Sequence, residues 1–293
     1  EGTIPVHYSN QETLKEVWEN DWNFHPVVQS LVAISALLHD VGKANDTFQR
    51  KLTSSTRIQQ DPLRHEFVSC IFVVAMARLA NADDITLLDY LEKGIYEIDS
   101  LIALVKQISI EAYPFQNIPD YCFCIIWLII GHHKLPIDED YKRWKDISLT
   151  DINTFKKILS KNWGYYNIQQ EMQNLVFSKG IVMQSSAWVS QMSKWAKKAK
   201  ATLDLFSNSM EDQTIRAILQ YARICLMFGD YLFSSSDHNT SWNSPLDLYA
   251  NTDKSYSLKQ YLDEHILGVQ KEALTMSHLL PRFEKDLDYA EDV

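Results

Sequence analysis

The sequence predicts an all-α fold, and two observations support that prediction. Glycine and proline number only 8 each in 293 residues, which is too few for a sandwich, barrel or propeller with a turn about every 8–12 residues. Long segments instead repeat apolar residues at helical spacing, without a helix breaker inside them. With 46% apolar and 23% charged residues, the chain can bury a large core and is not intrinsically disordered.

Each expected helix has a start signal, a stop signal or an apolar period. The first begins near Pro26 and ends near Gly42. The second begins at the capping pair Asp61-Pro62 and continues to Leu79. The same criteria predict further helices near 84–93, 98–111, 119–133, 185–206, 211–235 and 256–271.

The chain shows no internal repeat, and we expect one domain over residues 1–293. Its core would span about 26–236. A polar, weakly periodic stretch over about 140–180 is a candidate helical insertion, and a C-terminal helix with an acidic linker would cover about 256–293. The chain starts with Glu1 and not Met, so we expect it to be an excised domain.

Composition excludes several function classes. The formal charge of −10 provides no overall basic field for long duplex nucleic acid, so a polyanion would have to be held locally. The four cysteines form no Cys-x-x-Cys pair and are typical of buried thiols in a reduced compartment. The longest strongly apolar stretch, Tyr121–Ile130, is about half of the ~20 residues that a membrane span needs. No secretory signal is seen, and we expect a cytoplasmic protein without a membrane partner.

The strongest local motif is His39-Asp40-Val41-Gly42-Lys43, at the end of an apolar helix. Where the chain leaves helical geometry, the imidazole and the adjoining carboxylate can converge on one cation. Neutral imidazole suits borderline transition metals, and a carboxylate can bridge two ions. Lys43, one turn further on, could meet a phosphate oxygen or be a surface lysine beside a helix end.

Three further places supply side chains of the same kind. His65 lies in the first turn of the second long helix, where it is either a ligand or an imidazole satisfied near a helix start. His132-His133 end an apolar run shortly before Pro136, and a helix that unwinds before a proline lets both face one cavity.

Asp230 lies inside an apolar helical run. Burying its charge costs several kcal/mol unless it is paired or binds a metal. The alternative to a metal is a salt bridge to Arg223, about two helical turns away, or to a basic residue of a neighbouring helix.

Together these residues predict a dinuclear centre inside a helical bundle. Four imidazoles and two carboxylates suit two divalent ions, with Asp40 as the bridge. Imidazole-rich coordination favours Mn, Fe, Co or Ni over Mg. Such a centre can hydrolyse a phosphodiester. The predicted ligands are His39, Asp40, His65, His132, His133 and Asp230.

The order His-Asp, His, His-His, Asp resembles the HD phosphohydrolase superfamily. More narrowly, it resembles the HD nuclease domain of the type I CRISPR-associated nuclease-helicase. Four tracts are most similar to subtype I-F, in which this domain is fused to an adaptation subunit. They cover residues 37–45, 61–66, 127–136 and 222–235.

The resemblance implies an HD-type helical bundle that cleaves single-stranded DNA with metal ions, by nicking followed by exonucleolytic degradation. It also implies a helicase domain in the same polypeptide and a CRISPR surveillance complex as partners. A phage-encoded inhibitor is a further candidate partner. The alternatives are an HD-family phosphohydrolase acting on nucleotides or cyclic nucleotides, and a catalytically inactive helical partner-binding module.

The resemblance also divides the ligands between two ions. His39, Asp40 and Asp230 would hold one, and Asp40, His65, His132 and His133 would hold the other. The family has an earlier histidine on the first ion. Here that ligand would be His7 or His25, would lie upstream of Glu1, or would be absent.

Asp40 and Lys43 are the predicted catalytic residues. The predicted DNA path includes Lys43, Arg64 and Lys134, with exposed aromatic residues stacking bases. The four lysines of segment 194–200 are either part of this path or a solvated helix face.

Overall fold

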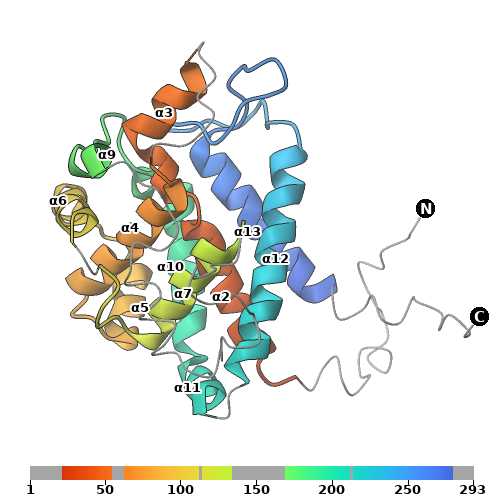
Figure 1. The fold of residues 1–293 in the computed structure, drawn as a ribbon. Coiled ribbons are helices and arrows are strands. Elements are labelled where there is room, and N and C mark those ends of the chain that lie inside the picture. Colours follow the sequence, from red (N-terminus) through yellow and green to blue (C-terminus); the bar gives the residue numbers. More distant parts are fainter. Residues whose placement is uncertain (1–21, 55–62, 112–113, 134–168, 212–213, 280–293) are drawn as a thin grey trace, which may run out of the picture.

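The computed structural model describes residues 22–54, 63–111, 114–133, 169–211 and 214–279. Within these ranges the regular elements are helices, with two isolated antiparallel bridges, Tyr249–Tyr261 and Thr252–Leu258, and no strand (Figure 1). The all-α prediction is confirmed. The elements are α2 (His25–Leu38), η1 (Val41–Ala44), α3 (Asp46–Thr53), α4 (His65–Leu79), α5 (Asp84–Lys93), α6 (Ile98–Ser109), α7 (Asp120–Gly131), α9 (Gln169–Gln173), η2 (Val182–Gln184), α10 (Ser186–Lys200), α11 (Leu203–Glu211), α12 (Ile215–Ser235) and α13 (Leu262–Leu279).

Helix α2 is the central element of the bundle. It packs against α7, α10, α12 and α13, and Figure 1 shows it in the middle of these helices. The segment His25–Ala44 is long and apolar enough to cross a membrane, but 89% of its most apolar window is buried. Such burial is expected of the central helix of a bundle, because neighbouring helices cover it on all sides.

Helices α4 and α7 are also apolar around nearly their whole circumference. On α7 every residue from Tyr121 to Gly131 is buried, and on α4 every residue from His65 to Ala77 is buried. Apolar helices of this kind anchor firmly in a core. The polar residues at their ends therefore lie in fixed positions.

Several helix boundaries differ from the sequence prediction. Helix α4 begins at His65, with Arg64 as its N-cap in an extended conformation, and not at Asp61-Pro62. The helix expected over 185–206 is two helices, α10 and α11. At the break, the Thr202 hydroxyl donates to the Ala199 carbonyl oxygen, a local bond that competes with helix continuation. The helix expected at 256–271 begins at Leu262, because the two bridges close a turn in which Tyr256 has a positive φ of 63°.

Some predictions concern residues outside the described ranges. Most of the candidate insertion at 140–180 is among them, and its described end contains only the short helix α9. The final acidic linker from residue 280, His7 and Lys134 also lie outside the described residues.

Candidate metal centre

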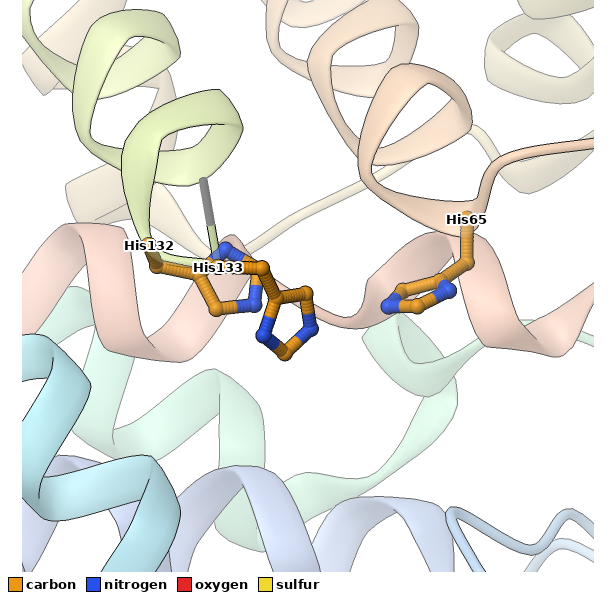
Figure 2. Close-up of side chains that lie close together, drawn as sticks. All are labelled: His65, His132 and His133. Carbon is orange, nitrogen blue, oxygen red and sulfur yellow. The ribbon is translucent and has the colours of Figure 1, made fainter. Parts of the chain in front are cut away.

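Two groups of side chains could each hold a metal ion, since within each group the ligand atoms lie within 4.8 Å of one another. In Figure 2, His65 at the start of α4 extends toward His132 and His133 at the end of α7. The first group is His39, Asp40, Asp230 and His265, and the second is His65, His132 and His133.

Gly42 explains why the ends of α2 and α4 meet. Its backbone N–H donates to Ser69 Oγ at 2.9 Å. A Cβ atom on Gly42 would overlap the carbonyl oxygen of His65 and lie 2.7 Å from Ser69 N. Only glycine therefore lets η1 pack directly on the first turns of α4. This close approach places His39 and Asp40 beside His65.

Asp40 lies between the two groups and is 1% exposed. Its Oδ1 is 3.2 Å from Nε2 of His65. Its Oδ2 is 3.2 Å from Nε2 of His39 and 3.1 Å from Nε2 of His265. One carboxylate oxygen therefore faces each group, which is the arrangement that a bridging ligand requires.

Three of the histidines are held by an oxygen acceptor at Nδ1. His39 Nδ1 contacts the Ala36 carbonyl oxygen at 2.7 Å, and His132 Nδ1 contacts that of Ile129. His265 Nδ1 lies 3.1 Å from Oε1 of Gln260. A carbonyl oxygen can only accept, so Nδ1 carries the proton and, in the neutral ring, Nε2 presents its lone pair.

Gln260 is completely buried and has an unambiguous orientation. Its Nε2 donates to the carbonyl oxygens of Phe233 and Ser236, at 3.0 and 3.1 Å. Its Oε1 must therefore be the atom that accepts from His265. In this way Gln260 links the C-terminal end of α12 to a histidine of α13.

His65 differs because a carboxylate lies on the far side of its ring. Its Nδ1 is 3.4 Å from Oε2 of Glu66, which is 1% exposed. Burial opposes ionisation of Glu66, but the charges of His65 and Arg64 outweigh burial and lower the pKa of Glu66 to about 2. Histidines that bind metals commonly donate their second N–H to a carbonyl or a carboxylate. His39, His132 and His265 follow that rule, whereas His65 lies at ion-pair distance from Glu66.

The donor set fits a cation. The Nε2 lone pairs of His39 and His265 face the same oxygen of Asp40, and such acceptor atoms repel unless a proton or a metal lies among them. Nε2 of His132 is buried and has no hydrogen-bond partner within the described part of the chain. A cation between these atoms would satisfy all of them.

The pKa shifts agree with that interpretation. Burial lowers the pKa of His265, and burial together with the charge of His133 lowers the pKa of His132 to about 3, so both rings favour the neutral form that binds metals. Burial also opposes ionisation of Asp40, but His39 and Lys43 hold its pKa well below the usual range. The pKa of His39 is raised because Asp40 outweighs the effect of burial. Without a cation, a proton on His39 thus balances part of the negative charge.

All six predicted ligands lie at this centre, and the structure adds a seventh residue that the sequence reasoning missed. His265, from α13, completes the first group. His25 does not reach the centre, because it lies at the opposite end of α2, where its Nε2 contacts the Ser277 carbonyl oxygen at 2.9 Å. The one sequence signal for His265 was a histidine within the predicted C-terminal helix.

Two of the predicted substrate-binding cations, Lys43 and Arg64, form ion pairs with buried acids. Lys43 Nζ is 2.6 Å from Oδ2 of Asp40, and Arg64 Nη2 is 2.7 Å from Oε1 of Glu66. In the lysine cluster of α10, Lys200 forms an ion pair with Glu92 at 2.9 Å. This ion pair favours the alternative in which the lysines form a solvated helix face.

Asp230 forms no salt bridge with Arg223, and its ion-pair contacts are with histidines of neighbouring helices. Arg223 Nε donates to the Gly131 carbonyl oxygen at 2.6 Å. Asp230 Oδ1 instead lies 3.6 Å from His265 Nε2 and accepts from Ser234 Oγ at 3.0 Å. Asp230 therefore belongs to the first group of candidate ligands.

Comparison with known proteins places this geometry in a family context. The family model described as "Cas3, HD domain" matches residues 6–222. A CRISPR-associated nuclease/helicase Cas3 of subtype I-F/YPEST from Pectobacterium atrosepticum is 31% identical over 98% of the chain. The protein of the same description from Pseudomonas aeruginosa is 27% identical, again over 98% of the chain. The chain spans only 27% of the length of each relative.

Proposed function

This chain belongs to the Cas3 HD domain family, and from that premise we propose that it is a metal-dependent nuclease domain that hydrolyses phosphodiester bonds of single-stranded DNA. It would nick the strand and then degrade it exonucleolytically. The proposed setting is a cytoplasmic CRISPR interference effector. The relatives are described as nuclease/helicases, which supports a helicase domain in the same polypeptide.

The observation that carries this proposal is the position of Asp40 between two groups of imidazoles. Two ions about 3.5–4 Å apart, bridged by one carboxylate, form the clamp that many phosphodiesterases use. His39, Asp40, Asp230 and His265 would hold one ion. Asp40, His65, His132 and His133 would hold the other.

Two divalent ions bound there would lower the pKa of an attacking water and stabilise the charge that develops in an in-line displacement. The imidazole-rich set favours Mn, Fe, Co or Ni over Mg. The chain's own residues keep these ligands in place. Gln260 orients His265, the charge of Glu66 lies beside His65, and the apolar helices α2 and α7 keep bulk water from one side of the centre.

We further propose that Lys43 contacts the substrate. Its side chain is 12% exposed, and its ammonium group lies beside Asp40. A phosphate that approaches the centre could therefore contact this ammonium group, which would offset negative charge on the nonbridging oxygens. Lys43 would thus stabilise a bound phosphodiester while also balancing the charge of Asp40.

The net charge of −10 gives the isolated domain little general affinity for DNA. We propose that the helicase domain and a CRISPR surveillance complex deliver the strand, so that this domain binds only the few nucleotides near its centre. A phage-encoded inhibitor would act by covering the metal centre.

The test is cleavage of circular single-stranded DNA by the metal-loaded chain, beside a panel of nucleotides and cyclic nucleotides. We expect nicked circles, with higher rates in Mn²⁺ or Co²⁺ than in Mg²⁺ alone. Asp40→Ala should lower the rate by at least about a hundredfold while the far-ultraviolet circular dichroism stays unchanged. Asp204→Ala removes an exposed carboxylate of α11 and should leave the rate unchanged.

Other outcomes would support different functions. Phosphate release from mononucleotides with intact circles would support a nucleotide phosphohydrolase. A chain that binds almost no metal after reconstitution, and leaves DNA uncut in Mn²⁺, Co²⁺ and Ni²⁺, would support an inactive partner-binding module. Normal cleavage by Asp40→Ala would remove the shared carboxylate from the mechanism.

A further inference from the structure

Arg223 lies beside the metal centre but is not one of its candidate ligands. It precedes Asp230 on α12 by two helical turns, so both side chains leave the same face of the helix about 10 Å apart. Its Nε donates to the carbonyl oxygen of Gly131, the residue before His132. The guanidinium is thereby attached to the end of α7 that carries His132 and His133.

No carboxylate neutralises Arg223 within the described part of the chain. The Gly131 carbonyl oxygen is its hydrogen-bond acceptor, and burial alone lowers its pKa from the ordinary value. Lys43 and Arg64, the other described cations near the centre, each pair with a buried acid. A partly buried guanidinium without an anion carries a desolvation cost that a bound anion would offset.

The geometry of the guanidinium leaves room for such an anion. A guanidinium has five N–H donors in one plane, and the bond to Gly131 uses only the one on Nε. The donors on Nη1 and Nη2 form a fork that matches two oxygens of a phosphate. Because Nε is fixed, the fork loses little further freedom when it binds.

The neighbouring face of α12 suits the bases of a nucleic acid strand. Tyr231, the residue after Asp230 on α12, is 74% exposed, and its side chain leaves the helix about 80–100° from those of Arg223 and Asp230. Single-strand binding proteins combine a cation that holds the backbone with exposed aromatic rings on which bases stack. A positive charge and aromatic surface on one helix favour a nucleic acid strand over a small anion.

We propose that Arg223 binds a backbone phosphate of single-stranded DNA, one or two nucleotides away from the phosphodiester at the metal centre. This inference rests on the proposed nuclease function, because it assigns a position to the substrate of that same centre. Arg223 would set the register of the strand, while the centre would cleave it. A substrate too short to reach from the metal centre to Arg223 would not contact the guanidinium.

The test compares Arg223→Gln and Arg223→Lys with the unmodified chain. Affinity for a fluorescent oligothymidylate is measured by anisotropy in EDTA over a range of salt concentrations, so that cleavage does not interfere. Arg223→Gln should bind about five- to tenfold more weakly, and its slope of log K against log salt should fall by about 0.7, the value for one lost phosphate contact. Arg223→Lys should show the same slope of log K against log salt as the unmodified chain.

The two substitutions separate charge from structure. Glutamine can still donate to the Gly131 carbonyl oxygen, so a purely structural role would make Arg223→Gln behave at least as well as Arg223→Lys. Lys106→Gln removes one exposed positive charge from α6, which packs against α4 and α9, and should change neither affinity nor slope. Equal slopes for all the proteins would overturn the inference.

Cleavage of linear oligonucleotides adds a second readout. In Mn²⁺, Arg223→Gln should raise KM more than it lowers kcat, while metal content per chain stays constant. If the unmodified chain cuts DNA and Arg223→Gln has the same KM and the same salt slope, the Arg223 assignment is wrong and the nuclease proposal stands. If the unmodified chain cuts nothing, the nuclease proposal fails, and the salt slopes still decide whether Arg223 contacts phosphate.

Discussion

At the scale of single residues, the candidate centre depends on where each imidazole keeps its proton. Ala36, Ile129 and Gln260 each place an oxygen acceptor at an Nδ1 atom. The corresponding Nε2 atoms therefore converge on the centre as acceptors. A site built in this way favours a cation before any substrate arrives, because the acceptor atoms are already close together.

His265 offers the sharpest test at this scale. His265→Ala should reduce bound metal from two ions to about one per chain, because His65, His132 and His133 remain for the second ion. We expect cleavage of single-stranded DNA to fall by about 10–100-fold or more, since even outer partners of metal ligands have effects of that size. Elemental analysis after Mn²⁺ loading measures the stoichiometry directly.

The control for this substitution comes from the same helix. His278→Ala removes an imidazole that contacts Gln29 at 2.8 Å, away from the centre, and should keep both ions. If His265→Ala retains two ions at unchanged affinity, His265 is a packing residue and the first group lacks its fourth ligand.

The sequence could identify six of the residues at the centre but not His265. His39-Asp40 and His132-His133 are conspicuous because paired polar residues interrupt apolar helices. His265 instead stands alone in a helix of ordinary amphipathic composition, where a histidine is more often a packing residue. Its contact with Asp40 joins positions at opposite ends of the chain, and local patterns carry no information about such a contact.

At the scale of the elements, helix ends supply five of the seven candidate ligands, and Asp230 and His265 lie within α12 and α13. His39 follows the last residue of α2, His65 is the first residue of α4, and His132 follows the last residue of α7. Adjacent residues inside a helix diverge by about 100°. The end of α7 lets His132 and His133 lie with ring centroids 3.8 Å apart.

The contact between α12 and α13 gives a prediction at this scale. Gly229 precedes Asp230, and a Cβ atom on it would lie 2.6 Å from Ala273 N and 2.7 Å from Ala273 Cβ. In an open helix, glycine to alanine stabilises by about 1 kcal/mol. Here the overlap with α13 should cost about 1–3 kcal/mol. Gly229→Ala should therefore lower the free energy of unfolding, as measured in urea.

The same substitution should weaken metal binding, because α12 carries Asp230 and α13 carries His265. The compensating double variant Gly229→Ala/Ala273→Gly removes the overlapping Cβ atom and should recover part of both losses. A Gly229→Ala protein as stable as the unmodified chain would show that the two helices can separate without cost to the fold.

At the scale of the whole molecule, the fold class followed from turn composition and apolar period, whereas the connections between helices did not. The break between α10 and α11 coincides with the contacts of Thr202 to the Ala199 carbonyl oxygen, inside a segment whose pattern is continuously helical. The late start of α13 depends on bridges that pair residues of a polar loop. Both features arise from specific contacts, to which helical periodicity is insensitive.

The centre draws its ligands from α12, α13 and the ends of α2, α4 and α7, so metal binding should stabilise the whole domain. An ion that binds only the folded state at a hundred times its dissociation constant adds about 2.7 kcal/mol to stability. For a chain of this length we therefore expect Mn²⁺ to raise Tm by about 5 °C. Differential scanning calorimetry over a Mn²⁺ titration measures the shift, and Asp40→Ala should show almost none. Equal shifts in both proteins would place the bound ions elsewhere, and an unchanged Tm in the unmodified chain would mean that these side chains converge without binding manganese.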